Sequence, residues 1–205
     1  MKEPKIRFPE FTGEWVEKKL GEIGSFKKGQ AFSKNEITST GDKFCIHYGE
    51  LFTKYQEIIT EVISKTNSQM RVPSESGDIL FPASDVTPTG LARCSAILKD
   101  NILLGGDIII LRPEIPLNSG FLSYEINTQK ESIIRLVIGA VVKHITPSAL
   151  ATLTVFVPPT LDEQQKIADC LSELDALIAA ETEQLENLKD HKKGLMQQLF
   201  PQPAK

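Results

Sequence analysis

The sequence predicts an α+β protein: a mixed, mainly antiparallel sheet domain over residues 1–157, followed by one long coiled-coil helix over residues 158–205. Three observations support this prediction. Short β-branched runs recur at roughly ten-residue spacing before residue 157, which is typical of an antiparallel sheet. Two prolines at 158–159 follow the last run and resist helix before them. The apolar residues after the prolines then follow a seven-residue repeat.

In the first domain, a proline-rich arm anchored by Phe8, Phe11 and Trp15 leads into a strand or short turn. Asn118 or Ser119 is expected to cap a helix that runs to about residue 137. Thr146 followed by Pro147 indicates the start of a short helix. The apolar runs predict strands within residues 44–51, 57–64, 76–81, 91–98, 101–111 and 153–157.

The long helix is predicted to begin after Pro159 and to end at Pro201. Thr160 and Glu163 fit the S/T-x-x-E capping box, in which each side chain bonds to a backbone N–H of the other. A helix of roughly 39 residues would span about 58 Å at 1.5 Å per residue.

The a and d positions of the repeat are mostly Ile or Leu, as in a narrow coiled-coil seam. No apolar stretch elsewhere in the chain is long enough to cover such a rod, so we expect it to pair with another helix. The alternative is an amphipathic helix packed on its own domain. In an antiparallel pair, we favour the register that places Glu181 opposite Lys192, because no layer then pairs a polar with an apolar residue. The a and d residues are Gln164, Ile167, Leu171, Leu174, Ile178, Glu181, Leu185, Leu188, Lys192, Leu195 and Leu199.

The net charge of −4 argues mildly against a nucleic-acid partner, but the charge is unevenly divided. Residues 1–157 hold 18 basic and 18 acidic residues, whereas residues 158–205 hold five and nine. A neutral domain can still carry a basic patch. Cys45, Cys94 and Cys170 have no C-x-x-C spacing, so we expect reduced thiols without a chemical role. Because there is no signal peptide and no long apolar run, we expect a soluble cytoplasmic protein.

Catalytic motifs are missing from the sequence, which has no P-loop, no G-x-S-x-G and no H-E-x-x-H. The three histidines have no ligand-like spacing, and we expect no metal site. Asp78, Asp85 and Asp107 could meet in space, but aspartates at strand ends usually cap turns. The sequence therefore disfavours a self-contained enzyme.

Residues 25–34, SFKKGQAFSK, interleave charged and amide side chains with two aromatics around a glycine. This composition suits a loop that contacts a phosphate backbone. The alternative is an ordinary solvated hairpin.

Several motifs occur in an order that resembles one known family. Pro158 to Ala168 resembles the P-x-x-E-Q-x-x-I-A opening of the spacer helix in specificity (S) subunits of type I restriction–modification enzymes. The other matching stretches are Ile6 to Pro9 with Trp15, Lys19 to Ile23, Ser76 to Leu80, and Lys189 to Phe200. A usual S subunit has two target-recognition domains and two spacer helices, whereas this sequence has one of each. The resemblance thus implies a half-subunit, either natural or truncated.

The resemblance implies a non-catalytic subunit that recognises DNA. Two copies, paired through antiparallel helices, would recognise a palindromic bipartite target, one half-site per chain. Methyltransferase (M) subunits would dock on the helices and supply S-adenosylmethionine, so no cofactor is expected in this chain. Restriction (R) subunits would join for cleavage.

Recognition domains vary most between relatives, so the expected DNA contacts rest on residue chemistry and loop position. They are Lys27, Lys28, Gln30, Lys34, His47, Tyr48, Lys54, Tyr55, Ser84, Asp85, Thr87, Thr89, Arg93, Lys143 and His144. Two alternatives stay open: an assembly or regulatory half-subunit that binds M subunits without recognising DNA, and a DNA-binding regulator with a dimerisation helix.

Overall fold

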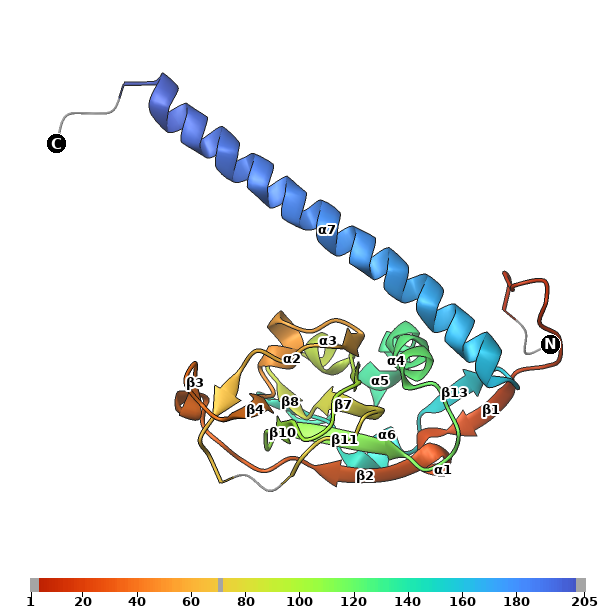
Figure 1. Ribbon diagram of the computed structural model, residues 1–205. Coiled ribbons are helices and arrows are strands. Elements are labelled where there is room, and N and C mark those ends of the chain that lie inside the picture. The colour runs from red at the N-terminus through yellow and green to blue at the C-terminus, as the bar shows by residue number, and fades with distance from the viewer. Residues whose placement is uncertain (1–3, 70–71, 202–205) are drawn as a thin grey trace. The chain divides into compact units, whose positions relative to one another are not determined.

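The computed structural model describes residues 4–69 and 72–201, and Figure 1 labels the elements. The chain divides into two compact units, Met1–Ala168 and Asp169–Lys205. The first unit therefore includes the first turns of the C-terminal helix, whereas the sequence predicts a boundary before that helix, between residues 157 and 158.

A five-stranded sheet forms the centre of the first unit. β5 and β9 run parallel, and the other neighbours run antiparallel, so the predicted mainly antiparallel sheet is confirmed. In sheet order the strands are β2 (Gly24–Lys28), β11 (Ile108–Pro113), β7 (Asp78–Pro82), β9 (Ser95–Ile97) and β5 (Ile58–Ile59).

Both faces of this sheet are buried, because successive side chains point to opposite faces and each face has its own apolar cluster. Ile79 and Phe81 of β7 belong to the larger cluster, and Leu80 between them belongs to the smaller one. Ile109 and Ile110 of β11 divide in the same way. The unbroken apolar run in β11 is therefore explained by a strand buried on both sides.

Short helices supply the larger cluster with Leu91, Phe121, Ile133 and Leu150, among others. These helices are α1 (Leu20–Ile23), α3 (Pro88–Leu91), α4 (Ser119–Thr128), α5 (Lys130–Arg135) and α6 (Pro147–Leu150).

Two predicted helix starts form as expected. Asn118 accepts a hydrogen bond from Phe121 N at 2.8 Å, and Thr146 accepts one from Ala149 N at 3.2 Å. The single helix predicted to run to about residue 137 is wrong, because the chain breaks at Gln129 into α4 and α5. The Gln129 side chain donates to the carbonyl oxygen of Thr154, at 2.8 Å.

A smaller sheet contains β10 (Leu103–Leu104), β4 (Lys43–Ile46), β6 (Lys65–Thr66) and β3 (Ile37–Thr38), in that order. A 3-10 turn, η1 (Lys34–Glu36), precedes β3, and α2 (Glu50–Thr53) follows β4. The strand predicted for residues 44–51 is therefore only half formed. The strand predicted for 57–64 is also shorter, because the chain leaves the large sheet and Ser64 O accepts from Cys45 N at 2.9 Å.

Two short antiparallel pairs complete the first unit. β1 (Val16–Lys19) pairs with β13 (Thr154–Val157), and β8 (Ser84–Asp85) pairs with β12 (Lys143–His144).

The C-terminal helix, α7, runs without interruption over Leu161–Leu199, as Figure 1 shows. Thr160 Oγ1 accepts from Glu163 N at 3.3 Å, so the first half of the predicted capping box forms. The Glu163 carboxylate does not play its predicted part. It is buried, and it accepts from Arg7 and Trp15 of the N-terminal arm. No helix in the described ranges is long and apolar enough to cross a membrane.

Candidate nucleic-acid interface

Three strands, β2, β7 and β11, begin or end at one edge of the large sheet. This edge runs across the strand ends and is not an outer strand. The register places Lys28 of β2 beside Ile109, and Pro82 of β7 beside Ile108, where β11 begins. The segments that leave this edge, residues 29–34 and 83–90, contain many of the expected DNA contacts. The turn at 105–107 enters β11 at the same edge. The sheet therefore gathers segments that are distant in sequence.

Glycines allow two of these segments to pack backbone against backbone. A Cβ on Gly29 would lie 1.9 Å from Gly105 O, and one on Gly106 would lie 2.6 Å from Ala31 Cα. Gly105 N also donates to Ile46 O, at 2.9 Å, which holds β4 in place beside the turn. Because no larger residue fits, this close packing fixes how the loops meet.

A hollow of about 230 Å³ lies where the loops meet. Its lining includes Phe32, His47, Tyr48 and Asp107. Aromatic rings form a continuous row beside it. The ring centroids of Phe32 and His47 are 5.5 Å apart, those of His47 and Tyr48 are 4.6 Å apart, and those of Tyr48 and Phe52 are 6.3 Å apart. Edge and tilted contacts of this kind stabilise aromatic pairs and fix ring positions.

A buried carboxylate, that of Glu50, stabilises the His47–Tyr48 turn by hydrogen bonds. Glu50 accepts from His47 N at 2.8 Å, from Lys54 Nζ at 2.6 Å and from Ser64 Oγ. A second hollow, of about 530 Å³, adjoins this turn and is lined by Lys34 and Lys54 among others. Burial lowers the pKa of His47, and the nearby Lys34 ammonium lowers it further, whereas the Glu50 and Asp107 carboxylates raise it.

The β8–β12 pair adds a second group of polar residues. Lys143 lies opposite Asp85, and His144 lies opposite Ser84. Ser84 Oγ donates to Asp107 Oδ2 at 3.1 Å, which connects this pair to the hollow. A further two candidates lie close by: Thr87 caps α3 and donates to Asp85 at 2.9 Å, and Thr89 donates to Thr87 at 3.3 Å.

Four expected contacts are engaged elsewhere in the fold. Tyr55 is only 8% exposed and belongs to the smaller apolar cluster, and Arg93 donates to the carbonyl oxygen of Tyr55 at 2.7 Å. Lys143 Nζ donates to two carbonyls of its own loop, at 2.8 Å each. Lys54 is paired with Glu50. Because these four side chains are buried or already have partners within the fold, the candidate interface does not include them.

Lys27 and Lys28 are exposed, but they lie on strand β2, not in the predicted loop. Successive strand residues point to opposite faces, so the two lysines cannot act as one cluster. Gln30 and Lys34 do lie on the segment after β2, and both are exposed.

The sequence did not predict Phe32, Glu50 or Asp107 as parts of the candidate interface. The Gly105-Gly106 pair before Asp107 was a usable signal, because paired glycines mark a turn or a close backbone approach. The sequence carries no signal that Glu50 would be buried.

Asp78 has a different role from Asp107. It forms a bidentate ion pair with Arg112, and both contacts are 2.8 Å long. Among the described residues, no group of His, Cys, Asp and Glu could hold a metal ion.

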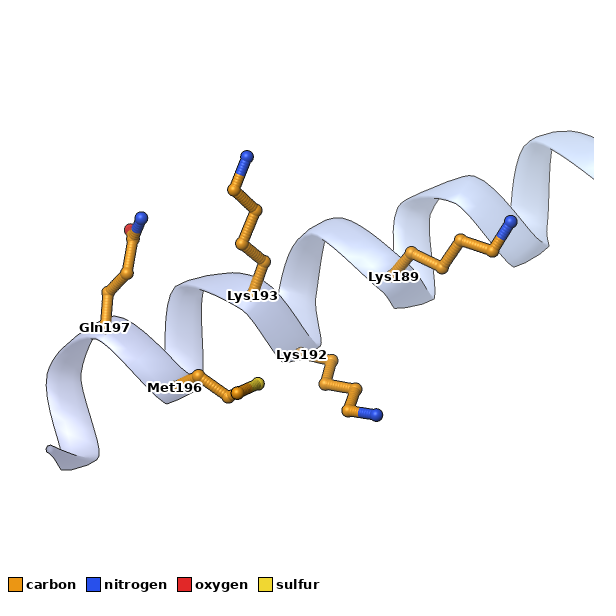
Figure 2. Close-up of a pocket in the computed structure, with 5 residues that line it drawn as sticks. All are labelled: Lys189, Lys192, Lys193, Met196 and Gln197. Atoms are coloured by element: carbon orange, nitrogen blue, oxygen red, sulfur yellow. The ribbon is translucent and has the colours of Figure 1, made fainter.

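The heptad face of α7 is largely exposed in the described chain. From Leu174 onward, its Leu and Ile side chains are between 42% and 73% exposed. Gln164 and Ile167 differ: Gln164 is 3% exposed, and Ile167 packs against the larger apolar cluster. In Figure 2, Lys192 and Met196 are drawn below the helix, and Lys193 and Gln197, one position further along, are drawn above it.

A polar, loop-built sheet edge and an exposed apolar helix face are surfaces of the kind that mediate binding. The comparisons with known proteins specify its family. The model described as type I restriction modification DNA specificity domain matches residues 12–190. The chain therefore belongs to the type I restriction–modification DNA specificity family, as the sequence motifs indicated.

Individual relatives agree with this assignment. The type I restriction enzyme MjaVIII specificity subunit of Methanocaldococcus jannaschii is 24% identical over 197 residues, which cover 95% of this chain and 43% of that protein. The crystal structure of a type I restriction–modification S subunit from M. genitalium matches with a TM-score of 0.65 at 19% identity, over 96% of this chain and 48% of that one.

A chain from a structure of type I restriction–modification complex assembly matches with a TM-score of 0.64 at 18% identity. That match covers 94% of this chain and 45% of the other. This chain thus spans slightly less than half the length of these relatives.

Proposed function

We propose that this chain recognises one half-site of a bipartite DNA target for a type I restriction–modification complex. Membership of the specificity family is the observation that carries the proposal. The described residues contain one central five-stranded sheet, which would contact one half-site, and the chain covers less than half the length of the relatives.

The polar edge of the large sheet is the proposed DNA surface. Exposed lysines there would contact phosphates and set the position on the duplex, while shorter side chains reach base edges. The aromatic row gives the surface fixed rings, which favours a preformed interface. The proposed residues are Lys27, Gln30, Phe32, Lys34, His47, Tyr48, Ser84, Asp85, Thr87, Thr89, Asp107 and His144; Lys28 points to the opposite face from Lys27 and is left out.

Two copies would pair through α7 as antiparallel helices, since the heptad face is exposed over most of its length. A helix of 39 residues is about 58 Å long, which exceeds one duplex turn of about 34 Å. Two domains carried by such a pair can reach half-sites separated by a gap. Because the copies are identical and related by a two-fold axis, the target would be palindromic.

M subunits would dock on the paired helices and transfer methyl groups from S-adenosylmethionine, and R subunits would join for cleavage.

The test is to purify this chain together with its M subunit and map the methylated adenines in genomic DNA. The expected result is a palindromic, gapped target. Two unlike half-sites, without another S chain present, would contradict the homodimer. A stable complex with M subunits that methylates without sequence preference would instead support the assembly role.

A further inference from the structure

The imidazole of His47 is held in one tautomer. Gly49 N donates to His47 Nδ1 at 3.2 Å, so Nδ1 is the acceptor and the ring proton of the neutral form lies on Nε2. Burial lowers the His47 pKa, which favours this neutral form near pH 7. Contacts with Phe32 and Tyr48 fix the ring. His47 therefore presents a single N–H donor.

Asp107 brings an acceptor to the same hollow. Its carboxylate has about four lone-pair sites, and Ser84 Oγ donates to one oxygen, Oδ2. The turn that carries Asp107 is fixed by two backbone hydrogen bonds: Asp107 O accepts from Ala83 N at 2.8 Å, and Ile108 N donates to Gly105 O at 3.1 Å. One donor and one acceptor, each on a rigid support, thus line one hollow.

We propose that His47 and Asp107 together select an adenine by its major-groove edge. This inference rests on the proposed function. Adenine is the one base that presents an acceptor, N7, beside a donor, the N6 amino group. The His47 Nε2–H donates to N7, and the Asp107 carboxylate accepts from N6. Guanine presents two acceptors, so its O6 would face the carboxylate; cytosine presents a donor without an acceptor, and thymine an acceptor beside a methyl group.

Each residue contributes a different part of this selection, so the two single variants relax it differently. Asp107→Ala keeps the donor to purine N7, so the position should accept adenine or guanine. His47→Ala keeps the acceptor, so the position should accept adenine or cytosine. The wild-type preference at this position should be about 5- to 150-fold, the range for one bidentate base contact.

The experiment is selection of bound duplexes from a randomised double-stranded DNA library, using the complex of this chain with M subunits. Glu114→Ala is the matched control, because Glu114 is an exposed carboxylate that follows β11, whereas Asp107 precedes it. The control should select the wild-type motif. Circular dichroism and retained preference at the other positions of the motif show that each variant is folded.

A second measurement leaves the protein unchanged. Replacing the selected adenine with 7-deazaadenine removes N7, and should weaken wild-type binding about 5-fold or more. The same replacement should have no effect on His47→Ala. Variants that keep the wild-type motif, or wild-type binding that 7-deazaadenine at each adenine of the motif leaves unchanged, would overturn this inference and leave the proposed function intact. A wild-type complex that selects no sequence at all would contradict the proposed function itself.

Discussion

Arg7 and Glu163 form a bidentate ion pair that joins the N-terminal arm to the first turn of α7. Arg7 Nε lies 2.7 Å from Glu163 Oε1, and Nη2 lies 2.8 Å from Oε2. Trp15 Nε1 adds a hydrogen bond to the same carboxylate, at 3.3 Å. Glu163 is only 1% exposed, so these hydrogen bonds replace the water that an exposed carboxylate would bind. The arm and the helix start therefore stabilise one another across 156 residues of sequence.

We expect Arg7→Ala to lower the free energy of unfolding by about 3–5 kcal/mol, because it leaves a buried carboxylate without its charged partner. The double variant with Glu163→Gln should recover much of the loss, since a neutral amide is less costly to bury. Urea unfolding followed by fluorescence measures both, and Trp15, the single tryptophan, reports from this site.

Lys166 and Glu10 supply the matched control, because they also join the helix to the arm but are both about half exposed. Lys166→Ala should cost much less than Arg7→Ala, as is usual for surface pairs. Equal losses in Arg7→Ala and Lys166→Ala would show that burial does not set the strength of the Arg7 pair.

The second prediction concerns the two lysines of β2. Replacing both Lys27 and Lys28 with Ala should weaken binding similarly for all DNA sequences. Because the two side chains point to opposite faces, only one should contact a phosphate, and the salt slope should fall by about 0.9, not twice that. We expect Lys27 to be the contact, since its partner Ile110 lies in the smaller apolar cluster, against which Tyr48 also packs.

The measurement is DNA affinity against salt concentration for each single variant and for the double variant. Lys99→Ala is the control: it is exposed and lies near the other end of the sheet, shortly after β9. Equal effects of Lys27→Ala and Lys28→Ala would count against the strand geometry as the deciding factor.

The third prediction concerns thiol reactivity. Burial raises the pKa of Cys45 to about 11 and of Cys94 to about 12, whereas Cys170 is exposed on α7. At pH 8, one thiol per folded chain should react rapidly with a disulfide reagent, and all three should react in denaturant. Cys170→Ser should abolish the rapid reaction, while a second rapid thiol would show that a core cysteine is accessible.

The same pKa shifts have a consequence for stability. Folding raises both thiol pKa values above the ordinary value of 9.0, so ionisation favours the unfolded chain. The contribution of these thiols is present in full below pH 9 and is lost as the pH rises towards 11 and 12.

Local signals in the sequence were sufficient to predict several elements. The N-caps at Asn118, Thr146 and Thr160 each depend on one side chain and a backbone N–H three residues later, and all three form. The heptad pattern and the flanking prolines predicted a long helix, and α7 runs over nearly the expected residues.

Long-range contacts set the rest of the fold, and the sequence does not display them. Lys27 and Lys28 belong to a strand because β2 pairs with β11, far along the chain. Glu50 is buried because Ser64 and the His47 turn close over it. The hollow beside Asp107 exists because glycines let two distant loops touch, and polar loop residues alone do not show which loops will meet.

The last prediction is the register of the paired helices, for which the burial of the seam residues gives new evidence. Three antiparallel registers keep a long overlap, and they place Ile178, Leu185 or Lys192 opposite Glu181. The first needs Gln164 in the seam, but Gln164 is buried and donates to Pro158 O at 3.1 Å. The first two both need Ile167, which packs against the larger apolar cluster of its own domain.

The third register uses only residues that are exposed: Leu174, Ile178, Glu181, Leu185, Leu188, Lys192, Leu195 and Leu199. It pairs Glu181 with Lys192. The attraction within a matched charge pair can roughly balance the cost of desolvating both charges and can specify the register, whereas a lone buried charge is costly.

We therefore expect Glu181→Lys and Lys192→Glu each to weaken the dimer, and the double variant to recover much of the loss. Sedimentation equilibrium of the four chains gives the dissociation constants. Glu183→Lys, at an exposed position off the a and d seam, should have a smaller effect. Losses that simply add in the double variant would rule this register out, because two residues that face each other cannot be energetically independent.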